Sequence, residues 1–448
     1  MLSITTDKKT VPWSWIFLLS IPVAVFAYIE KCSGTALTFT LQKYTSDPAL
    51  IAFVGSINKI FGVVIAPYAA YKSDFFSSRF GRRKGLIIIG FAAVAVSMVM
   101  LPNCNSLLAT VVIVILLQAS VDFGYTGPWK PMFFDIVPKK QRGKSMVVNR
   151  YSSIALRFVF MFFLLGNFDM KMGGGMPKKV LGKNIVSSIT GEQLIYYLGA
   201  LGVVVSLFVV MFFVKDKKSQ PQDKVRVKIS EYVKYFFTNK QAGMICLLMI
   251  CYTLMSTRLM TLRPLLITEQ FGYSKQVLGN IHAFTMLTNT LVILPIIMCV
   301  IDKIDKFKLF MICLCLSTLH PIVYWSYVKF FAPMQIPSQS AIIFFNIADS
   351  VFDRTAFLVL WPIVFDYTDP LKKGFVNSGV LVVAGLVSFM NINLMGGVVK
   401  LYSHFFAADG TYDYMSTYLY IFAAGIIALV GTFFFAAKRR GVYSDVEF

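Results

Sequence analysis

The stretch Lys72-Ser-Asp-Phe-Phe-Ser-Ser-Arg-Phe-Gly-Arg-Arg-Lys-Gly85 places five cations, one carboxylate and two glycines between two long apolar runs. Of the 448 residues, 57% are hydrophobic and 15% are charged, and the mean hydropathy is +0.68. This composition is more apolar than that of soluble domains. A helix needs about 20 residues to cross a bilayer core, and a backbone in lipid must satisfy its own hydrogen bonds. The chain is therefore predicted to be an all-α membrane protein in which this stretch is a loop.

Twelve apolar runs along the chain are long enough to be transmembrane helices. They fall into two groups of six, separated by a polar segment with eight cations and three acids. We therefore expect an N-terminal bundle over residues 1–214, a linker over 215–240 and a C-terminal bundle over 241–448. The predicted helices cover residues 13–40, 49–71, 86–102, 107–134, 146–168, 193–214, 241–268, 276–301, 309–331, 339–367, 374–399 and 414–437.

The Lys and Arg residues between the predicted helices gather on one side of the membrane if the helices alternate in direction. Cytoplasmic loops carry such an excess of cations, so both termini are predicted to be cytoplasmic, in a protein of the cell membrane. The net charge of +21 is then a topology and inner-leaflet signal rather than a nucleic-acid surface. The cationic segments are 72–84, 139–144, 215–240, 303–308, 372–373 and 438–440; a lysine-rich loop after the fifth helix is an exception to the pattern.

Motifs typical of enzymes and metal sites do not occur in the sequence. The seven cysteines are scattered without metal-binding spacing, and neither a P-loop nor a nucleophile elbow is found. No cofactor is therefore expected. Uphill transport would have to use an ion gradient, of H⁺ or Na⁺, or exchange.

The two halves carry matching cytoplasmic loops. Asp74 and Asp302 are 228 residues apart, and Asp135 and Asp366 are 231 apart, in similar surroundings. Several matches at nearly one offset indicate a duplication. Two related bundles enclose a cavity, and rocking them gives alternating access.

Three short segments carry a resemblance to a known family. They are Ser73-Asp74 with Ser78-Arg79-Phe80-Gly81-Arg82-Arg83, the pair Gly62 and Pro67, and Gly127-Pro128-Trp129-Lys130 with Asp135. With the two-half layout they resemble the major facilitator superfamily and, within it, the sucrose transporters and the glycoside-pentoside-hexuronide:cation symporters. The fold class implied is twelve transmembrane helices in two pseudo-symmetric six-helix bundles.

The resemblance also implies a cytoplasmic gate. Asp74 is expected to pair with Arg83 or a neighbouring cation and to face the start of the eleventh helix near Gly374. One departure concerns the substrate: the family's arginine in the fourth helix is Lys130 here, and lysine cannot make the bidentate fork of arginine, which argues against sucrose itself. The predicted gate residues are Asp74, Arg79, Gly81, Arg82, Arg83, Asp135, Arg142, Asp302 and Asp366.

Ionisable residues inside predicted helices are the candidates for transport chemistry, because they are costly in lipid and commonly mark pathways. A carboxylate that shares a cavity with Lys or Arg can exchange a bound cation when the substrate arrives. Glu30, Asp122 and Asp353 are the predicted cation-coupling residues. The repeat pairs Asp122 with Asp353 and Glu30 with Arg258.

The predicted substrate site combines cations, carboxylates and aromatic rings. Other interpretations stay open: Glu30 can lie at the outer interface, Lys130 and Arg263 can extend to the membrane surface, and His282, His320 and His404 are more simply packed or interfacial. The candidate substrate-binding residues are Lys31, Lys59, Tyr125, Trp129, Lys130, Arg157, Arg258, Asp349, Arg354 and Trp361.

The predicted function is symport of a sugar or glycoside with H⁺ or Na⁺. Because intramembrane cations outnumber acids, an anionic substrate such as a uronide or organic anion is the alternative, and a transporter-like receptor that moves nothing is a third. The expected partners are a small-molecule substrate and the lipid bilayer, with no nucleic acid, for a monomeric protein.

Overall fold

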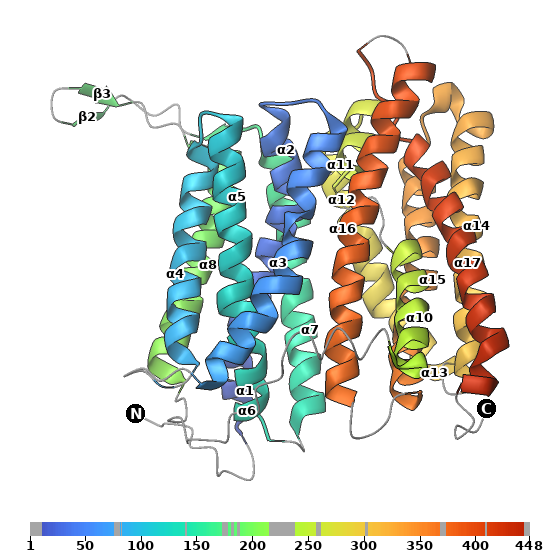
Figure 1. Ribbon diagram of the computed structural model, residues 1–448. Helices are drawn as coiled ribbons and strands as arrows, with labels where there is room; N and C mark the ends of the chain where they lie inside the picture. Colours follow the sequence, from blue (N-terminus) through green and yellow to red (C-terminus); the bar gives the residue numbers. More distant parts are fainter. Residues whose placement is uncertain are drawn as a thin grey trace. The chain divides into compact units, whose positions relative to one another are not determined.

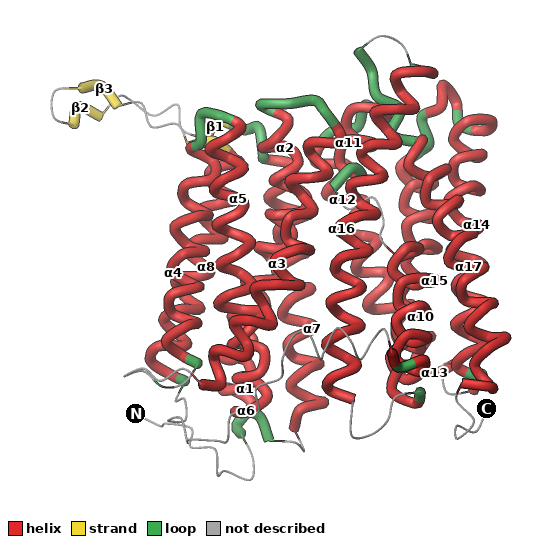
Figure 2. Tube along the Cα trace, viewed as in Figure 1, coloured by secondary structure: helices red, strands yellow, loops and turns green. Residues whose placement is uncertain are grey.

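Helices make up nearly all of the secondary structure (Figures 1 and 2). The chain has two compact units, one of residues 1–46, 60–221 and 273–280 and the other of 47–59, 222–272 and 281–448. The computed structural model describes residues 11–75, 81, 83–138, 141–172, 178–180, 183–185, 189–214, 238–256, 261–300, 303–367, 373–407 and 410–442.

The first unit contains the predicted spans one to six, with α3 beginning in the second unit and continuing here. Several spans are α-helices interrupted by a π-helical turn. The bounds are α1 Trp13–Lys31, η1 Cys32–Ala36, α2 Leu37–Gln42, α3 Pro48–Phe75, α4 Lys84–Met100, α5 Leu107–Val121, η3 Asp122–Trp129, α6 Lys130–Ile136, α7 Arg142–Val159, η5 Phe160–Leu164 and α8 Gly191–Phe213, with 3-10 turns η2 Leu101–Asn103 and η6 Leu165–Asn167.

The second unit contains the predicted spans seven to twelve, with the first residues of α12 assigned to the first unit. The bounds are α10 Lys240–Ser256, α11 Arg263–Leu265, η7 Leu266–Gln270, α12 Lys275–Thr288, η8 Asn289–Ile293, α13 Leu294–Val300, α14 Lys306–Ser326, η10 Tyr327–Phe331, α15 Gln339–Asp366, α16 Lys373–Phe406 and α17 Ser416–Val442, with a 3-10 turn η11 Pro333–Gln335.

The same helix pairs pack together in both units. In the first unit α1 packs on α7 and α8, and α4 packs on α5 and α8. In the second unit α10 packs on α16 and α17, and α14 packs on α15 and α17. Each pair in the second unit is the counterpart, six spans later, of a pair in the first. The two units therefore have the pseudo-symmetric packing expected of a duplicated six-helix bundle.

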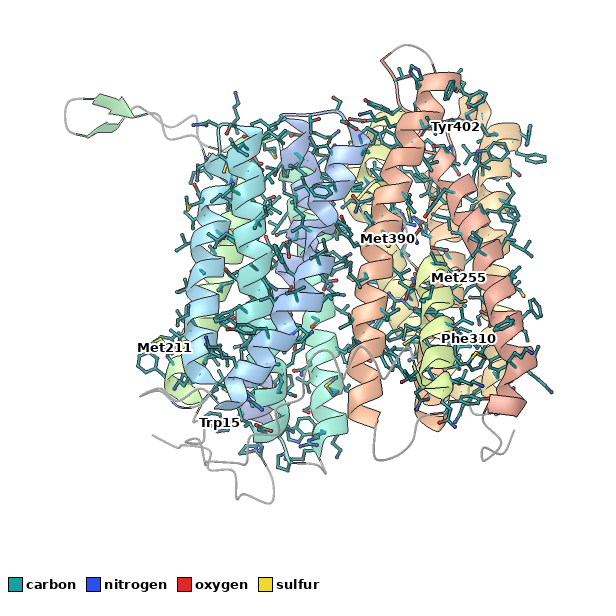
Figure 3. The ribbon with its side chains drawn as sticks, in the orientation of Figure 1. Trp15, Met211, Met255, Phe310, Met390 and Tyr402 are labelled. Carbon is teal, nitrogen blue, oxygen red and sulfur yellow. The ribbon has the colours of Figure 1, made fainter. Side chains whose placement is uncertain are left out.

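By length and composition, ten of the described helices can cross a membrane. The remaining two predicted spans correspond to α10, which is shorter, and to α15, which carries Asp349, Asp353 and Arg354. The protein is thus an integral, multi-pass membrane protein. Large apolar side chains are exposed on its helices, as expected for contact with lipid. Met390 of α16, labelled in Figure 3, is 61% exposed, whereas Met255 and Phe310 lie in the apolar core of the second unit.

Three features differ from the sequence-based expectation. The predicted continuous helix 241–268 is interrupted, because Thr261 and Leu262 form a turn between α10 and α11. The eleventh helix extends to Phe406 rather than to 399. The loop after the fifth span contains short antiparallel pairs, β1 Lys171–Met172 with β4 Ile189–Thr190 and β2 Lys178–Val180 with β3 Lys183–Ile185.

Most of the predicted linker, residues 215–237, lies outside the described residues.

Candidate transport site

The fourth span of the first unit is fixed by very close backbone contacts. A Cβ atom added to Gly90 of α4 would lie 2.4 Å from the Cα of Gly124 in η3, and one added to Gly127 would lie 2.8 Å from the Cβ of Ala69 in α3. Glycine allows helix backbones to approach this closely inside a membrane. Pro128 has no N–H group, so the carbonyl of Gly124 cannot receive the usual α-helical bond. These residues hold η3 against both α3 and α4.

Asp122 is the first residue of this π-helical segment and is buried at 7% exposure. Its carboxylate is directed towards α3, because a Cβ atom added to Gly62 would lie 3.9 Å from the Asp122 Oδ2 atom. A larger residue at position 62 would fill the space beside the carboxylate. The sequence singled out Gly62 and Asp122 separately, and the structure places them beside each other.

Glu30 and Arg157 form an ion pair between the first and fifth spans. The Arg157 Nη2 atom donates to the Glu30 Oε2 atom at 2.6 Å. The Glu30 side chain is 58% exposed and that of Arg157 is 23% exposed, so the pair is accessible from outside the packed bundle. A charge-assisted bond of this length is among the stronger hydrogen bonds in proteins.

Lys130 and Tyr125 lie near this pair in the same unit. The Lys130 Nζ atom sits over the Tyr125 ring, 5.5 Å from its centroid, and Lys130 interacts electrostatically with Asp122 and Glu30. Tyr125 stacks on Phe26 of α1, with centroids 4.2 Å apart. One face of the Tyr125 ring is therefore already covered by Phe26.

Arg150 is a member of this cluster that the sequence analysis missed. It interacts electrostatically with Arg157 and Glu30. The signal was available, because Arg150 and Arg157 are seven residues apart in α7 and therefore share a helix face. The group of charges Glu30, Asp122, Lys130, Arg150 and Arg157 is called the first-unit cluster below.

Other predicted residues of the first unit lie in different surroundings. Trp129 is fully buried at 0% exposure, so its ring packs in the bundle interior. Lys31 and Lys59 are half-buried, and Lys31 directly precedes the π-helical segment η1.

The second unit has a group of three ionisable side chains from three helical segments. The Asp349 Oδ1 atom of α15 lies 3.4 Å from the His320 Nδ1 atom of α14, and its Oδ2 atom lies 4.0 Å from the Arg263 Nη2 atom of α11. Asp349 and His320 are 8% and 9% exposed. The sequence analysis assigned Asp349 to the substrate site, but it treated His320 as a packing residue and Arg263 as a cation near a helix end.

Asp353 is one helical turn beyond Asp349 and has a separate partner. The Tyr252 hydroxyl of α10 donates to the Asp353 Oδ1 atom at 3.2 Å. Arg354 and Trp361, on the same helix, are half-buried, and Trp361 packs against the apolar core. Arg258, the predicted counterpart of Glu30, lies outside the described residues.

Among the predicted gate residues, Arg83 and Asp135 form an ion pair. The buried Arg83 donates from Nη1 to the Asp135 Oδ2 atom at 2.6 Å, linking the start of α4 to α6. Gly81 adopts a φ of 120°, which favours glycine, and the Arg142 Nε atom donates to the Val137 carbonyl at 3.3 Å. Arg79, Arg82 and Asp302, and the side chains of Asp74 and Asp366, lie outside the described residues.

Asp47 lies just before α3 and forms an ion pair with Lys400 of α16. The Lys400 Nζ atom donates to Asp47 Oδ2 at 2.6 Å, and the Ala49 backbone N–H donates to Oδ1 at 2.9 Å. Partial burial raises the pKa of Asp47, but these hydrogen bonds lower it more, so the pKa lies below its usual value. No residue of this pair was identified from the sequence.

The comparison with protein families decides what these features belong to. The family model described as Major Facilitator Superfamily matches residues 19–327, which is more than half of the chain. The chain belongs to the Major Facilitator Superfamily. It is therefore a secondary transporter rather than an enzyme. A search of curated proteins finds no match.

Solved structures of superfamily transporters share this fold at low sequence identity. A mutant of the nucleoside transporter NupG has a TM-score of 0.71 at 12% identity, covering 94% of this chain and 99% of that one. A bacterial homologue of the human lysosomal transporter Spinster has 0.70 at 11%, covering 97% and 98%. A D-xylose–proton symporter has 0.63 at 11%, covering 94% and 97%.

In the described parts of this chain, no group of three or more His, Cys, Asp or Glu residues is arranged to hold a metal ion. The charged side chains of the first-unit cluster combine carboxylates with cations, which suits exchange of hydrogen-bond and ionic partners rather than coordination of a fixed metal.

Proposed function

We propose that this transporter is a symporter that moves a sugar or glycoside together with H⁺ or Na⁺ by alternating access. The observation that carries the proposal is the accessible ion pair between Glu30 and Arg157, with Asp122 and Lys130 in electrostatic range. Intramembrane charges of this kind usually serve a transport pathway.

The proposed mechanism is an exchange of partners within the first-unit cluster. A substrate whose oxygen atoms accept hydrogen bonds from Arg157 competes with Glu30 for the guanidinium group. Glu30 then needs another cation, and H⁺ or Na⁺ supplies it. Because such coupling is reciprocal, the bound cation favours the substrate as much as the substrate favours the cation.

The narrower assignment rests on the sequence motifs. The segments around Gly81 and around Pro128 support membership of the glycoside-pentoside-hexuronide:cation symporters or a sucrose-transporter-like group. The similarity to a structure named as a D-xylose–proton symporter agrees with this substrate class. Asp353 is proposed as a further coupling residue, and Lys31, Lys59, Arg258, Arg354 and Trp361 as further substrate contacts.

The proposed setting is the cell membrane, with both termini cytoplasmic and the protein acting as a monomer. The cationic loops support this orientation. We propose functional halves of residues 1–214 and 241–448 with a cytoplasmic linker between them, and a cytoplasmic gate that includes the Arg83–Asp135 pair, Asp74, Asp302 and Asp366.

An anionic substrate, such as a uronide or another organic anion, is the second candidate. Arg150 favours it, because the first-unit cluster then has three cations, Lys130, Arg150 and Arg157, against the two carboxylates of Glu30 and Asp122. The excess positive charge would attract a carboxylate and hold it by bidentate hydrogen bonds from arginine.

Uptake by purified protein in proteoliposomes tests the proposal. Vesicles with an imposed pH or Na⁺ gradient are given labelled neutral disaccharides and the matching uronates, in competition with one another. Gradient-dependent accumulation of the neutral sugar supports the first candidate, and accumulation of only the uronate supports the second. If nothing accumulates, while ligand still stabilises the protein against heat, the protein acts as a receptor and both transport proposals are wrong.

A further inference from the structure

The group formed by His320, Asp349 and Arg263 has a hydrogen-bonding pattern that requires a proton. The three side chains come from α14, α15 and α11. His320 and Asp349 are each more than nine-tenths buried. If two hydrogen-bond acceptors faced each other here, no water would be present to donate to them, and the arrangement would be costly.

The far side of the imidazole ring fixes the position of one proton. The His320 Nε2 atom lies 3.0 Å from the carbonyl oxygen of Phe345. A carbonyl oxygen only accepts hydrogen bonds, so Nε2 is the donor and carries a hydrogen. In the neutral ring, Nδ1 must then be the unprotonated nitrogen.

The near side of the ring faces a carboxylate. The Nδ1 atom lies 3.4 Å from the Asp349 Oδ1 atom. If the ring were neutral and Asp349 ionised, two lone pairs would face each other inside the protein, which is unfavourable. One additional proton, shared between Nδ1 and Oδ1, converts this repulsion into a hydrogen bond.

Arg263 offers Asp349 an alternative partner. Its guanidinium group only donates hydrogen bonds and lies 4.0 Å from the Asp349 Oδ2 atom. Both contacts are longer than the 2.7–2.9 Å of a closed charge-assisted bond, so the carboxylate lies between two donors and can close on either. When the proton leaves to water, His320 becomes neutral and Arg263 is the cation that can move closer to the charged Asp349.

We propose that His320 and Asp349 together hold one exchangeable proton, and that Arg263 becomes the partner of Asp349 when this proton leaves. Proton binding thereby competes with a contact from the short segment α11. The proton site itself stands on the contacts of three side chains; its use in coupling rests on the proposed symport function.

Other ionisable groups on the surrounding elements define the setting of the pair. Tyr324 of α14 stacks near His320 with centroids 6.4 Å apart, and Tyr418 of α17 packs against Tyr324. Asp353 is held by Tyr252. Among the titratable and charged groups on the elements packed around the pair are Tyr252, Arg263, Tyr324, Tyr327, Asp353, Arg354 and Tyr418.

Nuclear magnetic resonance of ¹⁵N-histidine-labelled protein tests the proton site directly, because the chain has only three histidines. His320→Gln assigns the signals, and His282 and His404 are internal references. We expect His320 to keep the hydrogen on Nε2 when neutral and to gain one on Nδ1 as pH falls. In Asp349→Asn the amide donates to Nδ1, so this protonation step is lost over the same pH range. Asp353→Asn removes a carboxylate one turn away, so it shifts the midpoint of the His320 protonation step but does not abolish the step.

The proposal is wrong if neutral His320 carries its hydrogen on Nδ1 in the wild type, a measurement that needs no variant. It is equally wrong if Asp349→Asn titrates like the wild type, or if Asp353→Asn abolishes the step as Asp349→Asn does. In proteoliposomes, His320→Gln and Asp349→Asn should lose accumulation driven by a pH gradient and keep exchange. If the wild-type protein moves no substrate, the proposed function fails while the resonance result still decides the proton site.

Discussion

The charged groups of the two units are built differently. In the first unit Glu30 and Arg157 are in direct contact at 2.6 Å and the Glu30 side chain is 58% exposed. In the second unit Asp349 is buried and lies 3.4 Å from His320 and 4.0 Å from Arg263. A closed, accessible pair can be opened by a competing ligand, whereas a buried carboxylate between two donors responds to a proton.

The comparison shows that the two units share their helix packing but not the residues that form their charged groups. The same helix pairs pack in both units, yet the fifth span supplies the arginine in the first unit, and the seventh, ninth and tenth spans supply the group in the second. We therefore expect the first unit to exchange Glu30 between Arg157 and the coupling cation when substrate binds, and the second unit to hold a proton of its own between His320 and Asp349.

The largest expected effect concerns the glycine crossing that positions Asp122. In Gly90→Val the new Cβ atom would lie 2.4 Å from the Gly124 backbone, and overpacking of this kind destabilises by about 1–3 kcal/mol or more. Thermal unfolding in detergent should show a large loss of stability. Gly397→Val is the matched control, because no atom lies within 4 Å of a Cβ added there. Equal effects of the two changes would contradict the close crossing.

Loss of the ion pair in the first unit should have the next largest effect. Glu30→Gln and Asp122→Asn each replace a carboxylate by an uncharged amide of similar shape. Accumulation against a gradient should fall by roughly tenfold, within the usual range of coupling energies. Exchange without a gradient should be much less affected. Glu269→Gln, which removes a carboxylate bonded to Tyr414 outside the cluster, should retain coupling. Unchanged accumulation in both cluster variants would exclude these residues from coupling.

A smaller effect is expected at the predicted gate. Asp135→Asn weakens the bond to the buried Arg83, but Asp135 is half-exposed and water can replace part of the lost interaction. We expect a loss of unfolding free energy of about 1 kcal/mol, measured as a lower melting temperature. Asp305→Asn, which retains a side-chain oxygen to cap α14, should change stability less. A gate role additionally requires a changed transport rate in Asp135→Asn at temperatures where the variant is folded.

The smallest effect is a pH dependence of stability from Asp47. Its pKa is lowered in the folded protein, so its contribution is present above the usual Asp pKa of about 3.9 and is lost as pH falls through the lower folded value. For an accessible pair the contribution is a fraction of a kcal/mol. Melting temperatures measured from pH 6 down to 3 should fall slightly more in the wild type than in Asp47→Asn. Identical slopes would show that Lys400 does not stabilise this carboxylate.

The sequence was sufficient for the fold because lipid imposes a strong rule on composition. Apolar runs of about 20 residues must be helices, and helices occur at all twelve predicted positions, with the seventh interrupted before Arg263. Asp122 could be singled out as a candidate because an acid in an apolar run is conspicuous, and its burial beside Gly62 became visible only in the structure. Arg150 was missed because it lies near the start of its helix, where charges are common.

The His320 group could not be predicted, for a different reason. His320 and Asp349 are 29 residues apart, on different helices, and no periodicity links them. A single histidine in an apolar helix is normally a packing residue, and only the packing of α14 on α15 brings it to a carboxylate. Contacts of this kind depend on rotation of one helix against another, which sequence spacing does not determine.

The π-helical segments have a consequence for how such a chain tolerates change in length. Six of them occur within the described spans, and each backbone bond in such a segment spans one residue more than in an α-helix. Removal of one residue from η5, Phe160–Leu164, would therefore restore a regular α-helical turn instead of breaking the helix. In a regular helix such as α4 or α8, deletion of one residue turns every later side chain to another face. The same deletion made in η5 should be tolerated better.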